Sequence, residues 1–345
     1  MDTASGTSRL AERLARGPVL CAEGYLFELE RRGYLQAGAY VPEVVLDHPE
    51  AVTELHREFV HAGSDVVEAF TYYAHREKLR LIGKEDRLEP LNRQALALAA
   101  EVARESGALL AGDVCNTNVY FEDAQSHRAV RAMFEEQVAW AAEAGVDFVI
   151  AETFHWGAEA VLAVEVIRAA GLDAVATLAI HRDALTREGW TPADACARLE
   201  QAGAAVVGLN CIRGPRTMLP LLAGIRAAVG VPVAALPVPY RTHEHEPTFQ
   251  SLTDPEAPAK PFPTGLDPFT CTRYDVAAFA REALEAGAGY LGLCCGAAPH
   301  HIRAMAEAMG RRPPASRYSP DMSKHAFLGS DARLQQENLA FAERL

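Results

Sequence analysis

The chain has 345 residues, of which 33 are Lys or Arg and 46 are Asp or Glu, so its formal net charge is −13. This acidity argues against general binding to nucleic-acid phosphates, which requires a basic face. Hydrophobic residues make up 49% of the sequence, as in globular proteins. No apolar run approaches the roughly 18–20 residues of a membrane span, and the N-terminal stretch has no signal-peptide core. We therefore expect a cytoplasmic protein with no nucleic-acid partner and no membrane partner.

Seven cysteines lie at positions 21, 115, 196, 211, 271, 294 and 295. An odd number of cysteines in a chain of this length predicts reduced thiols rather than a disulfide framework, which agrees with a cytoplasmic location. We expect Cys21, Cys196 and Cys271 to be small buried packing residues. The adjacent pair Cys294–Cys295 is the unusual feature of this set.

A short pattern recurs along the chain, in which an Ala-rich helical stretch ends at Ala-Gly and an apolar run follows. Glycine just past a helix supplies the left-handed cap, and the β-branched run after it is typical of a buried strand. The pattern occurs at 61–70, 143–152, 201–211 and 285–295. Filling the gaps predicts eight strands, near 18–22, 65–70, 108–112, 147–151, 174–179, 205–209, 231–235 and 289–293. The predicted helices between them include 90–106, 126–144, 158–170, 193–202, 217–229 and 275–286.

Eight strands that alternate with helices predict an α/β fold of the (β/α)8 TIM-barrel type. A doubly wound open sheet is the alternative, but no GxGxxG turn follows the first strand. We predict a single-domain barrel over residues 1–310, with a long loop at 237–273 after strand seven that forms a lid or active-site insertion. Residues 311–345 then form a short C-terminal arm, which is either an oligomerisation segment or a frayed terminus.

Barrel enzymes carry their chemistry where the strands end. Cys211, Cys294 and Cys295 converge there, and three thiolates that leave one position open suit a catalytic zinc ion. Adjacent cysteines both face one ion only where the strand bends, which Gly292 and Gly296 permit. On spacing alone, a redox pair and inert buried thiols remain alternatives. Other polar residues at predicted strand ends are Glu23, Thr71, Tyr72, Tyr73, Asp113, Cys115, Glu152 and Asn210.

Two cysteine motifs and three further segments carry a family resemblance. They are VVGLNC at 206–211, YLGLCCGAAPHHIRAMAE at 290–307, the stretch from FELERRGYLQAG to HREKL at 27–79, FVIAETF at 148–154 and RPPASRYSPDMSK at 312–324. In one collinear order over roughly residues 10–325, the sequence resembles the homocysteine S-methyltransferase family, and within it the betaine-dependent branch.

The resemblance implies a barrel that binds zinc through Cys211, Cys294 and Cys295, where the metal deprotonates the homocysteine thiol. The thiolate then takes a methyl group from an onium donor to give methionine, a step that needs no general base. It further implies a homo-oligomer. The homocysteine-binding residues that it implies are Glu152, Glu23, Gly24 and Asn210, and the aromatic residues around the donor cation are Tyr25, Tyr40, Tyr72 and Tyr73.

The sequence departs from the family pattern at several positions. The strand-one turn reads Ala22-Glu23-Gly24, so its carboxylate is displaced by one residue, and Tyr40 replaces a cage tryptophan. Thr153 replaces a tyrosine after the strand-four glutamate. These changes leave the donor open between a betaine-type ammonium and a sulfonium such as dimethylsulfoniopropionate or S-methylmethionine. A zinc- or thiol-binding barrel without turnover is the alternative from a different class.

Overall fold

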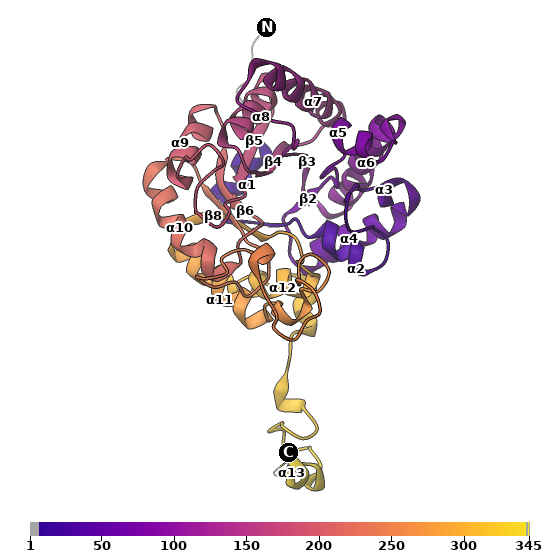
Figure 1. Cartoon of the computed structure of the whole chain (residues 1–345). Helices are drawn as coiled ribbons and strands as arrows, with labels where there is room; N and C mark the ends of the chain where they lie inside the picture. The colour runs from indigo at the N-terminus through magenta and orange to yellow at the C-terminus, as the bar shows by residue number, and fades with distance from the viewer. Residues whose placement is uncertain (1–6, 343, 345) are drawn as a thin grey trace.

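Eight parallel strands form a ring at the centre of the structure, which is a computed structural model that describes residues 7–342 and 344 (Figure 1). From β2 to β8 each strand pairs with its neighbours in chain order, and β8 pairs with β1. The gap between β1 and β2 is bridged by Asp65, whose backbone nitrogen donates to the Leu20 carbonyl at 2.7 Å and whose carboxylate accepts from the Leu20 nitrogen at 2.7 Å. The predicted (β/α)8 barrel is thus confirmed. The strands are β1 (Val19–Ala22), β2 (Val66–Glu68), β3 (Leu109–Cys115), β4 (Phe148–Phe154), β5 (Asp173–Leu178), β6 (Val206–Asn210), β7 (Val233–Leu236) and β8 (Ala288–Leu293).

Helices surround the ring, and the six that the sequence predicted are present with ends shifted by two residues or fewer. Glycines in the left-handed conformation end some of them, as at Gly63 and Gly107, and Thr191 and Thr272 cap the start of others. The principal helices are α4 (Pro49–Ala62), α6 (Leu88–Ser106), α7 (Ala124–Glu143), α8 (Gly157–Ala169), α9 (Pro192–Gln201), α10 (Pro215–Ala228), α11 (Arg273–Glu285) and α12 (Pro299–Ala308). Shorter helices are α1 (Arg9–Ala15), α2 (Tyr25–Arg31), α3 (Val44–Asp47), α5 (Arg76–Leu81) and α13 (Gln336–Ala342).

Along each strand every second side chain points into the barrel interior, and these inward-facing residues change from apolar to polar near the carboxyl ends of the strands. The interior apolar residues are Val19, Cys21, Val66, Leu109, Ala111, Phe148, Ile150, Val175, Val206, Ala234, Leu236 and Tyr290. Continuing the same alternation along each strand gives buried polar residues, namely Glu23, Glu68, Asp113, Glu152, Asn210 and Cys294. A polar layer therefore covers the apolar core at the carboxyl end of the barrel.

The long connection between β7 and α11 lies against this polar end. The nitrogen of Cys294 donates to the Pro237 carbonyl at 3.0 Å, and the nitrogen of Phe249 donates to the Ile212 carbonyl at 2.9 Å. The loop also contains the 3₁₀ turns η2 (Phe249–Ser251) and η3 (Asp267–Phe269). Its backbone is thus tied to the two loops that carry the cysteines.

The C-terminal segment leaves the barrel after the 3₁₀ turn η4 (Pro314–Tyr318) and reaches away from it to α13, through the short turn η5 (Met322–Lys324) (Figure 1). A further 3₁₀ turn, η1 (Glu85–Arg87), precedes α6. Within residues 7–342, no helix has both the length and the apolar character that crossing a bilayer requires.

Candidate active site

Three thiols meet at the carboxyl end of the barrel. Cys211 follows β6, and Cys294 and Cys295 follow β8; their Sγ atoms all lie within 4.8 Å of one another. The Sγ atoms of Cys294 and Cys295 are 3.9 Å apart. Because β8 ends at Leu293, both cysteines lie beyond the strand, where its alternation no longer separates them. The sequence therefore predicted this convergence correctly.

Two glycines make room for the cysteine turn. A Cβ atom at Gly292 would lie 1.9 Å from the Cys21 carbonyl oxygen, so only glycine lets β8 approach β1 here. Gly296 has φ +94°, and a Cβ atom there would lie 2.4 Å from Oη of Tyr240. The chain thus turns sharply directly after Cys295, at a position that favours glycine.

The backbone is strained at Cys211. This residue and Ile212 have φ values of 53° and 56°, in the left-handed region that non-glycine residues seldom adopt, at a cost of about 1–3 kcal/mol each. The Cys211 nitrogen donates to the Leu236 carbonyl at 2.9 Å. The buried guanidinium of Arg213 donates to the carbonyls of Ile180 at 3.0 Å and Thr217 at 3.2 Å. These contacts hold a conformation that directs the Cys211 thiol toward the other two.

The thiol cluster favours one negative charge. Hydrogen bonds from Cys294 and then from Cys295 hold the pKa of Cys211 well below its usual value. Burial raises the pKa of Cys294, and the contact with Cys211 raises the pKa of Cys295. Tetrahedral zinc with Zn–S bonds of about 2.3 Å places its sulfur ligands about 3.8 Å apart, which matches the observed 3.9 Å between Cys294 and Cys295. The three residues therefore fit a thiolate-bound zinc ion.

A carboxylate network lies directly beside the thiols. Oε2 of Glu152 is 4.0 Å from Sγ of Cys294 and accepts hydrogen bonds from Nδ2 of Asn210 at 2.6 Å and Oγ1 of Thr153 at 2.8 Å. Nδ2 of Asn210 also lies 3.3 Å from Oε2 of Glu23. Burial raises the pKa of Glu152 to about 8. The residues predicted to bind homocysteine, Glu152, Glu23 and Asn210, thus form one buried group.

Gly24 is the fourth residue assigned to homocysteine, in the strand-one turn. A Cβ atom there would lie 2.6 Å from the Ala297 carbonyl oxygen, so the turn packs closely against the chain that follows the cysteine pair. The nitrogen of Glu23 donates to the Leu293 carbonyl at 3.0 Å and is therefore already engaged.

Two further carboxyls belong to this network: Asp113, which the sequence placed at a strand end without a role, and Glu68, which no sequence motif singled out. Glu68 ends β2 and is 2% exposed, and Asp113 lies in β3 and is 5% exposed. Carboxylate oxygens of Glu68, Asp113 and Glu152 lie within 4.8 Å of one another. Burial, followed by the charge of Glu152, raises the pKa of both Glu68 and Asp113 well above the usual range. The period-two alternation from Val66 was the signal in the sequence that could have identified Glu68.

A narrow cavity of about 10 Å³ is lined by two of the three thiols, by the four carboxyls and by three aromatic residues, Tyr25, Phe70 and Tyr72. This volume corresponds to about one water molecule. Tyr25 and Tyr72 line it, together with Cys294, Cys295 and the four carboxyls. The structure therefore brings these two of the four tyrosines predicted for the donor site to the cavity wall.

The other two predicted tyrosines lie outside that wall. The Tyr73 ring packs on the Tyr72 ring with centroids 4.3 Å apart. The backbone nitrogen of Tyr73 donates a hydrogen bond to Sγ of Cys115 at 3.2 Å. Nζ of Lys78 lies 3.8 Å from the centroid of the Tyr73 ring. Tyr40 stacks on Phe27 with centroids 5.9 Å apart and lines a separate hollow of about 390 Å³. Both have positive φ, 61° at Tyr73 and 56° at Tyr40, so strained backbone recurs at these positions.

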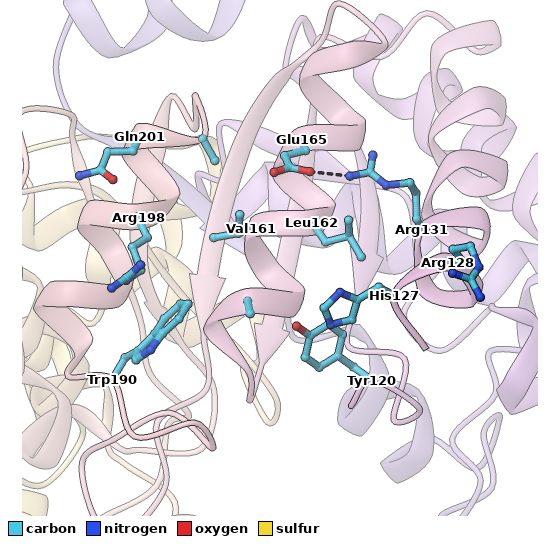
Figure 2. A pocket seen from close by; sticks show the side chains of 12 residues that line it. Tyr120, His127, Arg128, Arg131, Val161, Leu162, Glu165, Trp190, Arg198 and Gln201 are labelled. Atoms are coloured by element: carbon cyan, nitrogen blue, oxygen red, sulfur yellow. Dashed lines mark hydrogen bonds and ion pairs between the residues drawn. The ribbon is translucent and has the colours of Figure 1, made fainter. Parts of the chain in front are cut away.

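A larger groove lies elsewhere, on the outer face of the barrel between α7, α8 and α9 (Figure 2). It measures about 610 Å³ and is floored by Val161 and Leu162, with an ion pair of 2.5 Å between Arg131 and Glu165 across it. The Arg198 guanidinium stacks on Trp190 at 4.3 Å. None of the proposed site residues lines this groove, so the groove is not the proposed active site although it is larger than the cavity beside the cysteines.

Comparison with known proteins agrees with the geometry of the cysteine site. The family model described as homocysteine S-methyltransferase matches residues 24–309. Betaine–homocysteine S-methyltransferase 1 of Danio rerio is 39% identical over 330 residues, which cover 92% of this chain and 79% of the relative. S-methylmethionine–homocysteine S-methyltransferase of Rattus norvegicus is 37% identical over 335 residues, covering 93% of this chain and 86% of the relative.

The fold has solved counterparts as well. The metallated homocysteine methyltransferase MmuM of Escherichia coli aligns with a TM-score of 0.68 and 20% identity, covering 86% of this chain and 99% of that one. At this identity the likeness concerns the barrel alone. The match of the family model over most of the barrel, together with relatives that are nearly 40% identical along most of their length, carries the assignment. This chain belongs to the homocysteine S-methyltransferase family.

Proposed function

We propose that this protein transfers a methyl group from an onium donor to the thiol of homocysteine in a zinc-dependent reaction that yields methionine. The observation that carries the proposal is the cavity shared by two of three clustered thiols, four carboxyls and two tyrosine rings. Family membership supports the same reaction. A betaine-type donor is the leading candidate, and a sulfonium donor is the alternative.

Zinc held by Cys211, Cys294 and Cys295 would supply a Lewis acid that keeps the substrate thiol deprotonated at neutral pH. The protein's own contribution is to hold these three sulfur atoms together, through the strained turn at Cys211 and the glycine turn after Cys295. Burial of the site keeps water away from the substrate thiolate, which preserves its nucleophilicity.

The homocysteine ammonium would pair with Glu152 and Glu23, which Asn210 holds from one side. Because the Glu23 nitrogen is already bonded to Leu293, the substrate carboxylate would use other groups of the turn at Gly24. With its ammonium held in this way, the substrate would direct its sulfur toward the cysteine thiols, because Sγ of Cys294 lies 4.0 Å from Oε2 of Glu152.

The donor cation would be held by the faces of aromatic rings, which attract quaternary cations. Tyr25 and Tyr72 line the cavity and Tyr73 packs on Tyr72, whereas Tyr40 lines a separate hollow. In the reaction, a lone pair of the substrate sulfur forms the new S–CH₃ bond. The bond from methyl carbon to onium nitrogen or sulfur breaks, and its electron pair leaves with the neutral amine or sulfide.

The relatives differ in donor, because one is named for betaine and another for S-methylmethionine. A panel of donors, with methionine as the readout, therefore tests the proposal. Zinc-loaded protein, homocysteine and either glycine betaine, dimethylsulfoniopropionate or S-methylmethionine should give methionine with at least one donor. Zinc binding without turnover of any onium donor would instead support the non-catalytic zinc- or thiol-binding barrel.

We further propose that residues 311–345 serve as an oligomerisation arm beside a barrel domain formed by residues 1–310. Exposed apolar side chains on the arm support this, because it reaches away from the barrel (Figure 1). They are Met322, Phe327, Leu328 and Phe341. A cytoplasmic location is proposed because all seven cysteines are free thiols.

A further inference from the structure

Tyr240 lies between the two loops that carry the cysteines. It is fully buried in the long connection after β7. A Cβ atom at Gly214 would clash with the Tyr240 carbonyl oxygen, so the loop that follows Cys211 packs on the Tyr240 backbone. A Cβ atom at Gly296 would clash with Oη of Tyr240, so the turn that follows Cys295 packs on the Tyr240 ring. One residue therefore supports both parts of the cysteine cluster.

The buried hydroxyl of Tyr240 is held by Arg31. Nη2 of Arg31 donates a hydrogen bond to Oη of Tyr240 at 2.7 Å, and Nη1 donates to the Gly296 carbonyl at 3.3 Å. Among residues 7–342, Arg31 is the only hydrogen-bond partner of this hydroxyl. Buried polar groups require such partners. A single guanidinium thus bonds both the ring that supports the turn and the turn itself.

Arg31 reaches this position from the donor side of the site. It is the last residue of α2, the helix that begins at Tyr25 in the cavity wall. The Arg31 side chain is 29% exposed, and its Nε lies 3.9 Å from the carboxylate of Asp267, which is 75% exposed. An ion pair this long and this exposed contributes little. The bonds to Tyr240 and Gly296 are therefore the principal polar contacts of the Arg31 guanidinium.

The turn after Cys295 needs support from outside, because glycine does not fix its own backbone conformation. Gly296 has φ +94°, and the turn is closed by a hydrogen bond of 3.0 Å from the Ala297 nitrogen to the Cys294 carbonyl. Zinc–sulfur bonds of about 2.3 Å tolerate displacements of only about 0.2 Å. A small shift at Gly296 would therefore move the Cys295 thiol out of bonding range.

We propose that Arg31 and Tyr240 are positioning residues for the metal, which hold the turn after Cys295 in its zinc-binding conformation. With that turn in place, the Cys295 thiol stays within reach of a metal that Cys211 and Cys294 also bind. This inference rests on the proposed function and adds to it two residues that are not metal ligands. Groups that orient metal ligands from outside the ligand set change metal affinity by about 10- to 100-fold when they are removed.

The two residues should act through each other. Without the Arg31 guanidinium, a buried hydroxyl remains beside the turn with no partner, which is more costly than removing the hydroxyl itself. Arg31→Met should therefore disturb the turn more than Tyr240→Phe does. In the Tyr240→Phe background, where that hydroxyl is gone, Arg31→Met should have a smaller effect. If Arg31 only packed against α2, its replacement would have the same effect in both backgrounds.

The test measures how fast the full chain releases zinc. Zinc-loaded protein is mixed with an excess of the chromogenic chelator 4-(2-pyridylazo)resorcinol, and absorbance gives the release rate. Arg31→Met should release zinc about tenfold faster than the wild-type protein, and Tyr240→Phe about threefold faster. Adding Arg31→Met to Tyr240→Phe should accelerate release by no more than a further factor of about three.

Arg32 provides a matched control, because it is the next residue and carries the same charge. Its guanidinium pairs with Glu28 at 2.9 Å and with Glu58 at 2.6 Å, away from the cysteine turn. Arg32→Met should release zinc at the wild-type rate. Release that is as fast in Arg32→Met as in Arg31→Met would overturn the inference.

Cobalt(II) in place of zinc gives a readout that loss of stability alone does not move. Its visible absorption depends on the arrangement of the thiolate ligands, so the spectrum should change in Arg31→Met and stay the same in Arg32→Met. Wild-type spectra and wild-type release rates in both Arg31→Met and Tyr240→Phe would overturn the inference, whatever their thermal stability. An equal effect of Arg31→Met in the two backgrounds would do the same. If Arg31→Met does not fold, the release rate of Tyr240→Phe decides alone.

The failure of this inference can be told from the failure of the proposed function. A wild-type protein that binds no zinc overturns both. A wild-type protein that binds zinc and forms methionine, while Arg31→Met and Tyr240→Phe release zinc at its rate, overturns the inference and leaves the proposed function standing.

Discussion

The side-chain amide of Asn210 donates a hydrogen bond of 2.6 Å to the carboxylate of Glu152. The orientation of this amide is fixed, because its oxygen accepts a hydrogen bond from the Thr153 nitrogen at 3.0 Å. The NH₂ group must therefore point toward the carboxyls. A neutral donor thus positions the Glu152 carboxyl and leaves it without a cationic partner in the protein, so that it can pair with a cationic ligand.

Replacing Asn210 with alanine should weaken homocysteine binding by about tenfold, because Glu152 loses a charged hydrogen bond worth about 1.5–3 kcal/mol. Asn210 is a positioning residue in this account, so the KM for homocysteine should rise while the KM for the methyl donor changes little. Steady-state kinetics with each substrate varied in turn measures both values. An equal rise in both would indicate a general disturbance of the barrel end.

Tyr72→Leu should raise the KM for the onium donor by about tenfold, because cation–π contacts in a desolvated site contribute about 1–2 kcal/mol. The KM for homocysteine should stay within about twofold. Tyr72→Phe is the control, since it keeps the ring and removes only the hydroxyl, and it should retain wild-type donor affinity. Loss of donor affinity in Tyr72→Phe would contradict a role for the ring face.

Gly296→Ala should lower both the free energy of unfolding and zinc occupancy. The residue has φ +94°, and the new Cβ would meet the Tyr240 ring oxygen at 2.4 Å, which forces the turn after Cys295 to shift. Gly310→Ala is a matched control, because its φ is +80° and no atom lies within 4 Å of the new Cβ. Gly310→Ala should cost only the backbone strain of about 1–2 kcal/mol and retain zinc. Equal zinc contents in the two variants would contradict this account of the turn.

The contribution of His56 to stability should fall as the pH drops below about 6.5, whereas buried carboxyls with a raised pKa, such as Glu152 at about 8, act in the opposite direction. Burial lowers the pKa of His56 from its usual 6.5 to about 3, and its ring packs edge-on against Tyr25 with centroids 4.9 Å apart. Between these two pKa values the unfolded chain binds a proton that the folded protein does not. The contribution of His56 is therefore fully present above about pH 6.5 and is lost at about 1.4 kcal/mol per pH unit as the pH falls toward about 3.

His56→Phe should remove the contribution of His56 from the slope of stability against pH and leave the contributions of the other groups. Burial also lowers the pKa of other histidines in the same direction, to about 4 at His75 and about 3 at His155. Urea denaturation of both proteins between pH 4 and 7 measures the slopes. Parallel slopes for the variant and the wild-type protein would show that His56 does not contribute.

The fold was predictable because its signals are local: Ala-Gly helix ends and apolar strands are set by neighbouring residues. The thiol site was predictable for a related reason, since Cys211, Cys294 and Cys295 follow strands whose ends a barrel brings together. Glu68 was missed because it lies inside an apolar run, and the alternation from Val66 marks it as inward-facing only once Val66 is known to face the barrel interior. The distance of Tyr40 from the cavity wall was also hidden, because it depends on how a long loop packs on Phe27.

The most direct test of the central claim follows the methyl group itself. Zinc-loaded protein, homocysteine and a donor with CD₃ groups are mixed, and mass spectrometry measures labelled methionine alongside bound zinc. The wild-type protein should form CD₃-methionine, while Cys211→Ala and Cys294→Ala should lose zinc and turnover yet keep the barrel fold. Cys196→Ala, which removes a buried thiol from α9, should behave as wild type. Stoichiometric zinc in Cys211→Ala and Cys294→Ala, or absence of labelled methionine from the wild-type protein, would contradict the account.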